Sequence, residues 1–283
     1  MKKTMFTLLA AVAAAGCQLS EKPAEPPKVS VFSSSITKVA KQNKVTTAEA
    51  IRLLKEVGVT GFDSPYSNAQ IPEYIAAGLK PANLFGHVDF LGPDNGAKRT
   101  DDFIAAAVQY GAPRIMVVPD FFTLGGDQEA EYIRIRTGLG KLVHKARAKG
   151  LIVTVEDFGA ARNGARNPCS YAKYLKRFMD DLPDIGFALD SGNLYYAGDG
   201  EDIRDMMRFA GRRIRHVHLK DLTREDNHKY ASLGEGAVPN EDVVKGVAAL
   251  GYDDWWTLEN LVGADTLADA RRQVGVLRGW LGR

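Results

Sequence analysis

Eight short runs rich in β-branched and aromatic residues recur from residue 29 onward, and most are followed by a loop and a longer amphipathic segment. The runs cover residues 29–33, 59–63, 83–89, 114–119, 151–157, 185–190, 214–220 and 255–260. Strands that alternate with helices pair in parallel through right-handed crossovers. Eight such units in about 250 residues predict a (β/α)8 barrel of the TIM type, an α/β fold.

The main alternative is a doubly wound open sheet. That fold usually has a glycine-rich turn for phosphate after its first strand, and "VFSSSITKV" contains no glycine. The loops also favour the barrel. Connections from helix to strand are short, whereas those from strand to helix are long, above all 157–168 and 221–239. The longer loops predict which end of the barrel carries the functional site.

The N-terminal segment has the features of an export signal. In "MKKTMFTLLAAVAAAGC", two lysines precede an apolar stretch that is too short to span a bilayer stably. The ending resembles a bacterial lipobox, so we predict a signal peptide over 1–16 and lipidation of Cys17. The alternative is ordinary secretion, with cleavage after Ala15.

The proline-rich segment 17–28 is predicted to be a tether that holds a catalytic barrel, residues 29–283, away from a membrane. The protein is therefore expected to be an exported lipoprotein that is anchored in the membrane and faces the periplasm.

The charge balance disfavours a nucleic-acid partner. The chain has 37 basic and 35 acidic residues, and removal of Lys2 and Lys3 with the signal leaves 35 of each. A neutral protein offers no general basic surface to phosphates. An abasic-site nuclease on the same fold is disfavoured as well, because its three zinc ions need more histidines than are available here.

Four of the runs contain or end on a residue that can bind a metal. These residues are Glu156, Asp190, His218 and Glu259, separated by 34, 28 and 41 residues, or roughly one βα unit each. A single acid at a strand end is usually solvated or caps the next helix. Four such residues at the ends of consecutive strands would meet at one rim of the barrel. Their side chains predict a site there for Mn²⁺, Mg²⁺ or Co²⁺, with Zn²⁺ also possible.

The second half of the chain carries a family resemblance. "GFALDSGNLYYAG", "RIRHVHLKD", "LGEG" and "ALGYDDWWTLEN" are similar to motifs of the sugar phosphate isomerase/epimerase family, the xylose isomerase-like TIM barrels. The resemblance extends over residues 29–283. It implies the same four metal ligands, and it implies that Glu156 and Glu259 also form the acid/base pair.

One position departs from that pattern. Ketose 3-epimerases of the family have a substrate-binding histidine three residues after the aspartate of the sixth strand, and this chain has Asn193 there. Asparagine can still donate and accept hydrogen bonds, but it does not titrate near neutral pH. We expect Asn193 to bind substrate.

Further candidates for substrate binding lie at or near other strand ends. They are His87 in "FGHVDF", Asp63 at the end of the second run, and Lys220 in "HVHLKD", which alternatively begins a solvated loop with Asp221. His216 shares a strand face with His218 and is expected to lie deeper, hydrogen bonded or packed.

The expected function is that of a metal-dependent sugar isomerase or epimerase. The metal would stabilise an enediolate while one carboxylate removes a proton beside a carbonyl and another returns it. Because an exported enzyme rarely meets phosphorylated sugars, we expect free sugars or keto-sugars as substrates.

The alternatives are a dehydratase or lyase acting on a 3-keto-sugar, and a tethered carbohydrate-binding protein without catalysis. A retaining glycosidase is disfavoured, because it needs a carboxylate pair without a metal.

Overall fold

All eight predicted strands form, and they close into a single parallel barrel. The computed structural model describes residues 25–159, 161–162, 164–196, 203–226 and 229–283. The predicted signal peptide, Cys17 and most of the tether lie outside these ranges. The strands of the barrel are β1 (Val29–Phe32), β2 (Gly61–Pro65), β3 (Lys80–His87), β4 (Arg114–Val118), β5 (Ile152–Glu156), β8 (Gly186–Asp190), β9 (Ile214–Leu219) and β12 (Trp256–Leu258).

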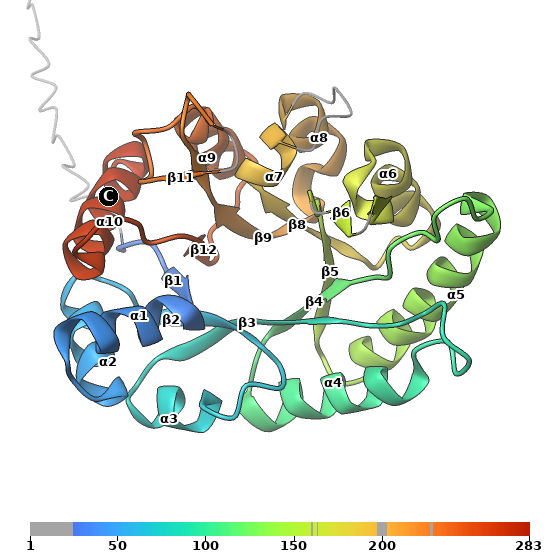
Figure 1. Ribbon diagram of the computed structural model, residues 1–283, viewed down its shortest axis with the longest axis horizontal. Helices are drawn as coiled ribbons and strands as arrows, with labels where there is room; N and C mark the ends of the chain where they lie inside the picture. The colour runs from blue at the N-terminus through green and yellow to red at the C-terminus, as the bar shows by residue number, and fades with distance from the viewer. Residues whose placement is uncertain (1–24, 160, 163, 197–202, 227–228) are drawn as a thin grey trace, which may run out of the picture.

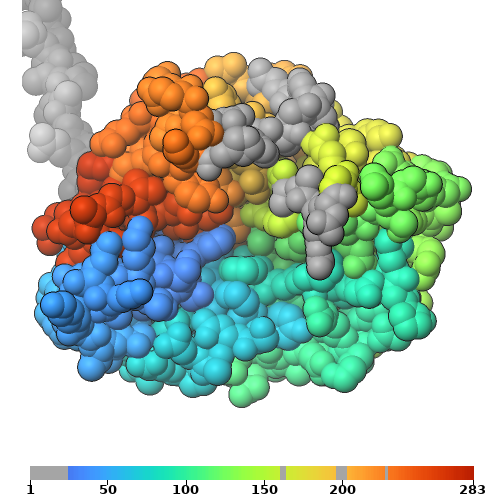
Figure 2. Space-filling model, in the orientation of Figure 1, coloured from blue at the N-terminus to red at the C-terminus, as the bar shows by residue number. Residues whose placement is uncertain are grey.

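The strands follow one another around the barrel in chain order. The ring closes where β1 pairs in parallel with β12, so that Val29 lies opposite Trp256 and Val31 opposite Leu258. The two ends of the described chain are therefore neighbours, and the blue and red segments meet in the space-filling view (Figure 2). The (β/α)8 barrel predicted from the sequence is confirmed.

Helices surround the strands (Figure 1). They are α1 (Ser33–Asn43), α2 (Thr47–Glu56), α3 (Ile71–Ala76), α4 (Ala97–Tyr110), α5 (Gln128–Arg147), α6 (Ala172–Asp181), α7 (Ser191–Tyr196), α8 (Ile203–Ala210), α9 (Asn240–Ala249) and α10 (Thr266–Leu281). Within the described ranges, none of these helices is long and apolar enough to cross a membrane.

Local sequence signals explain where several helices begin and end. The Thr46 side chain accepts a hydrogen bond from the Glu49 amide and caps α2, and Asp127 caps α5 in the same way. Gly58, Gly150 and Gly251, which follow α2, α5 and α9, have φ values of 101°, 75° and 84°. Side chains with a Cβ rarely adopt this left-handed backbone, so glycine allows each chain reversal.

The long loops after the strands contain two short antiparallel pairs that the sequence did not indicate. They are β6 (Ala161–Arg162) with β7 (Ala165–Arg166), and β10 (Asp221–Leu222) with β11 (Tyr230–Ala231). Asp221 organises the second loop, because its carboxylate accepts hydrogen bonds from the amides of Gly234, Gly236 and Val238. Asp221 therefore has a structural role at the rim.

Candidate metal centre and active site

The four predicted metal ligands converge at the carboxyl end of the barrel. Each of Glu156, Asp190, His218 and Glu259 offers one ligand atom, and these atoms all lie within 4.8 Å of one another. Strand register brings them together. Asp190 of β8 lies opposite His218 of β9, and Glu156 ends β5 on the other side of β8.

Lys220 connects two of these carboxylates. Its Nζ lies 2.8 Å from Asp190 Oδ2, 2.8 Å from Glu259 Oε1 and 3.0 Å from Asn193 Oδ1. Burial lowers the pKa of Lys220, but the carboxylates of Asp190, Glu259 and Glu156 outweigh this effect and raise the pKa well above its ordinary value. The side chain is therefore an ammonium ion within the ligand cluster.

Asp190 and Glu259 differ in their affinity for protons. Burial favours the neutral form of Asp190, but the positive charge of Lys220 lowers the pKa of Asp190 below its ordinary value. Burial and the neighbouring Asp190 raise the pKa of Glu259 well above its ordinary value. Two carboxyl groups this close share one proton more readily than they carry two negative charges.

The residues present fit a divalent cation. Three carboxyl groups and one imidazole form an oxygen-rich donor set of the kind that Mn²⁺, Mg²⁺ and Co²⁺ prefer and that Zn²⁺ also accepts. Glu259 Oε2 is buried and has no hydrogen-bond partner among the described residues. A buried carboxylate oxygen without a partner is costly unless something else in the site satisfies it.

Two of the four residues, Glu156 and Glu259, line a pocket of about 670 Å³. Aromatic rings of Phe32, Tyr66, Phe85, Phe158 and Tyr230 line part of its wall, and His87, Arg99, Glu156, Asn193, Lys220 and Glu259 supply polar groups. Apolar walls with a few convergent polar groups are typical of small-molecule sites. Among the predicted substrate-binding residues, His87, Asn193 and Lys220 line this pocket.

His87 is fixed at the edge of the pocket by β4 and the residues after it. Its Nδ1 lies 3.1 Å from the Val118 carbonyl oxygen, and its Nε2 lies 3.2 Å from Asp120 Oδ1. The hydrogen bond to Asp120 raises the pKa of His87 above its ordinary value. Asp120 directly follows the predicted strand 114–119 but was not among the predicted site residues, and its contact with His87 became apparent only from the pairing of β3 with β4.

Asp63, the remaining predicted substrate-binding residue, lies outside this pocket. It is fully buried inside the barrel and is not among the described residues that line the pocket. Its carboxylate is hydrogen bonded to His216 and His218. The structure therefore places Asp63 beneath the metal-ligand cluster, and the predicted direct contact with substrate does not fit this position. His216 lies deeper on the same face, as expected.

Comparisons with known proteins agree with this fold. A family model described as "Xylose isomerase-like TIM barrel" matches residues 9–279. An inosose dehydratase 2 from Bacillus cereus is 25% identical over 236 residues, which are 77% of this chain and 74% of that protein.

Two solved structures extend the comparison. A 3-keto-D-glucoside 4-epimerase from E. coli is 18% identical and has a TM-score of 0.70, covering 89% of this chain and 99% of its own. The IolI protein, solved with a zinc atom bound, is 13% identical and has a TM-score of 0.69, with coverage of 89% and 99%. At these identities the likeness shows a shared fold.

Proposed function

Since this chain belongs to the xylose isomerase-like TIM barrel family, we propose that it is a divalent-metal-dependent sugar isomerase or epimerase. The observation that carries the proposal is the convergence of four potential ligand atoms within 4.8 Å, with two of the four residues, Glu156 and Glu259, lining a sugar-sized pocket. Glu156, Asp190, His218 and Glu259 would hold the metal. A bound divalent cation would polarise the substrate carbonyl and make the neighbouring carbon a stronger acid.

The protein's own groups supply the proton transfer. Glu156 and Glu259 line the pocket from strands β5 and β12, so their carboxyl groups reach the substrate from different parts of the rim. One removes the proton beside the carbonyl. The other, in its protonated form, delivers a proton to the opposite face of the same carbon, which inverts that centre, or a proton relay to the next carbon shifts the carbonyl.

The substrate is proposed to be a free sugar or a keto-sugar. The predicted export of the chain favours unphosphorylated substrates. Aromatic rings of the pocket wall offer apolar faces to a sugar ring, while Asn193, His87 and Lys220 offer hydrogen bonds to hydroxyl groups.

A dehydratase or lyase acting on a 3-keto-sugar is the second candidate. Two observations favour it. The chain is similar to an inosose dehydratase, and the Lys220 ammonium lies beside Glu259, where it would protonate a leaving hydroxyl group. Both reactions begin with the same proton abstraction.

The test is incubation of the protein with a panel of free and 3-keto sugars in D₂O, followed by NMR. We expect deuterium at the carbon beside the carbonyl with metal-loaded protein, none after chelator treatment, and recovery when Mn²⁺ or Co²⁺ is restored. Inversion or carbonyl migration identifies an epimerase or isomerase, and loss of water identifies a dehydratase. If the protein binds a sugar without any deuterium exchange, the remaining hypothesis is a tethered carbohydrate-binding protein without catalysis.

Lys220→Met is expected to lower turnover about ten- to a hundredfold, because a hydrogen bond from a charged group contributes about 1.5–3 kcal/mol. Metal affinity should be kept or increased, since the change removes a positive charge beside Asp190 and Glu259. Steady-state kinetics and metal titration measure the two effects separately. Lys245→Met, which changes an exposed lysine paired with Glu241, is the matched control. Unchanged turnover in Lys220→Met would exclude contact between Lys220 and the substrate.

A further inference from the structure

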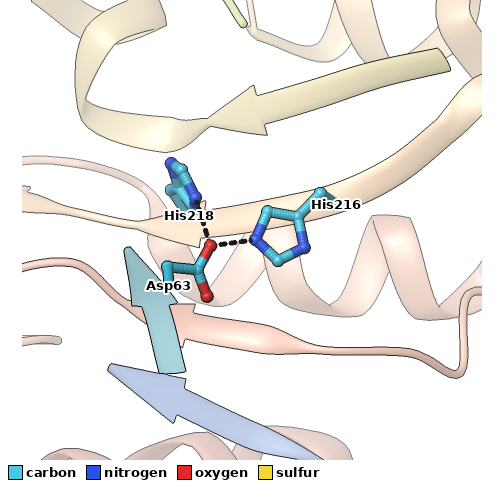
Figure 3. A group of neighbouring side chains, drawn as sticks. All are labelled: Asp63, His216 and His218. Carbon is cyan, nitrogen blue, oxygen red and sulfur yellow. Dashed lines mark hydrogen bonds and ion pairs between the residues drawn. The ribbon is translucent and has the colours of Figure 1, made fainter. Parts of the chain in front are cut away.

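A second polar cluster lies inside the barrel, directly beneath the metal-ligand cluster. Asp63 of β2 points toward two histidines of β9, and one of its carboxylate oxygens contacts both (Figure 3). Asp63 Oδ2 lies 2.6 Å from His216 Nε2 and 3.2 Å from His218 Nε2. All three side chains are fully buried. The interior of such a barrel is usually filled by branched apolar side chains, so packing alone does not account for this cluster.

Arg114 determines which nitrogen of His216 carries the proton. The Arg114 guanidinium, held by Asp254 and the Arg215 carbonyl, lies 3.2 Å from His216 Nδ1. A guanidinium can only donate, so His216 Nδ1 accepts. Its Nε2 therefore carries the proton and donates it to Asp63.

The other oxygen of Asp63 is also satisfied. Asp63 Oδ1 lies 2.9 Å from Ser30 Oγ and 3.1 Å from Thr257 Oγ1, and the two hydroxyls lie 2.7 Å apart, so one of them donates to the carboxylate and the other donates to its neighbour. The carboxylate thus accepts from three groups, one of these hydroxyls and the two histidines of β9. It is held in one orientation, because movement would leave buried donors unpaired.

His218 connects this cluster to the metal ligands. A carboxylate can only accept, so Nε2 of His218 carries a proton toward Asp63. The opposite nitrogen, Nδ1, lies 2.6 Å from Glu156 Oε1 within the ligand cluster, so it also faces a carboxylate and carries a proton when no cation is bound. A cation bound by the ligand cluster would take the place of that proton, whereas Nε2 would keep its proton toward Asp63. Phe32 packs edge-on against the His218 ring, with centroids 5.0 Å apart, and limits its rotation.

We propose that Asp63 is a positioning residue that fixes His218 in the tautomer protonated on Nε2, so that Nδ1 is the atom that binds the metal. Arg114 and His216 hold Asp63 in the orientation that does this. The inference rests on the metal centre of the proposed function. It replaces the predicted contact between Asp63 and substrate, and it agrees with the general finding that metal-binding histidines donate their other N–H to a carboxylate or carbonyl. It also argues against a cation between Asp63 and the two histidines, because His216 Nδ1 accepts from Arg114 and His216 Nε2 therefore keeps a proton there.

The test combines Zn²⁺ titration with ¹⁵N NMR of histidine-labelled protein. In the parent protein we expect His218 to bind Zn²⁺ through Nδ1 and to keep the proton on Nε2. Asp63→Asn has nearly the same size but lacks the charge. It should weaken Zn²⁺ binding about ten- to a hundredfold and should shift the ¹⁵N signal of His218 Nε2 in the Zn²⁺-bound protein, because that N–H loses its charged acceptor. Signals are assigned with a His218→Gln variant.

Thr257→Val is the matched control, because it removes a hydroxyl that lies 3.1 Å from both Asp63 Oδ1 and His216 Nε2 and leaves the contacts between Asp63 and the two histidines in place. It should keep the His218 Nε2 signal of the Zn²⁺-bound parent and bind Zn²⁺ within about threefold of the parent, although its stability falls. Binding through His218 Nε2, or an Asp63→Asn variant with an unchanged His218 Nε2 signal and unchanged Zn²⁺ affinity, would overturn the inference. Zn²⁺ bound through Nδ1 in a protein with no turnover on any sugar would refute the proposed reaction and leave this inference standing.

Discussion

Replacement of Glu156 or Glu259 by glutamine is expected to lower turnover at least about a hundredfold in each case. Glutamine keeps the size of glutamate and one of its two acceptor oxygens but cannot exchange a proton at neutral pH, and general acid–base catalysis contributes about 10²- to 10⁴-fold. Both side chains line the pocket beside Lys220 and Asn193, where a sugar carbon can reach them. The measurement is the steady-state rate with the sugar identified by NMR, on variants loaded with metal to the same stoichiometry.

A control variant and a second measurement show whether the loss of turnover comes from loss of proton transfer. Glu241→Gln changes an exposed glutamate of α9 that pairs with Lys245, and its turnover should equal that of the parent. Deuterium exchange into the substrate should fall in parallel with turnover in both active-site variants. Near-normal turnover in Glu156→Gln or Glu259→Gln would show that the replaced carboxylate is not the proton-transferring group.

Asp190→Ala is expected to abolish stable metal binding. The parent protein should retain about one divalent ion per chain after dialysis, and the variant less than about a tenth of that, because loss of a direct ligand exceeds the ten- to hundredfold cost of changing an outer partner. Elemental analysis of the dialysed proteins measures this directly. Asp190 is fully buried between Lys220 and the start of α7, so removal of its charge also leaves the Lys220 ammonium with one partner fewer.

Asp190→Asn separates loss of metal from loss of structure. Asp190 Oδ1 accepts hydrogen bonds from the amides of Gly192 and Asn193, both at 2.9 Å, and the asparagine carbonyl oxygen can keep both. The asparagine variant should therefore fold like the parent, as judged by circular dichroism, and still lose most of its metal. Full metal occupancy in Asp190→Asn would show that the ion is held elsewhere.

Much of the fold was predictable because its signals are local. A β-branched run forms a strand in almost any barrel, and Gly58, Gly150 and Gly251 mark helix ends through their own backbone preference. The extra pairs β6–β7 and β10–β11 were missed because they are two residues long and depend on loop contacts, such as those of Asp221.

The metal-ligand cluster was predictable for a different reason. Once the strands are parallel and neighbours in chain order, residues at their carboxyl ends must meet at one rim. Glu156, Asp190, His218 and Glu259 follow from that rule and from their residue types. Asp63 follows the same rule by position, yet it points into the barrel and pairs with β9.

The sequence by itself determined the eight strand–helix units and the set of side chains that gather at the functional end, because hydrophobic periodicity and strand ends are properties of consecutive residues. Only the tertiary structure decided which of these side chains contact one another. Lys220 lies between Asp190 and Glu259, and Asp63 reaches a histidine 153 positions further along the chain. Such contacts depend on the closure and register of the whole barrel, which no short stretch of the chain specifies.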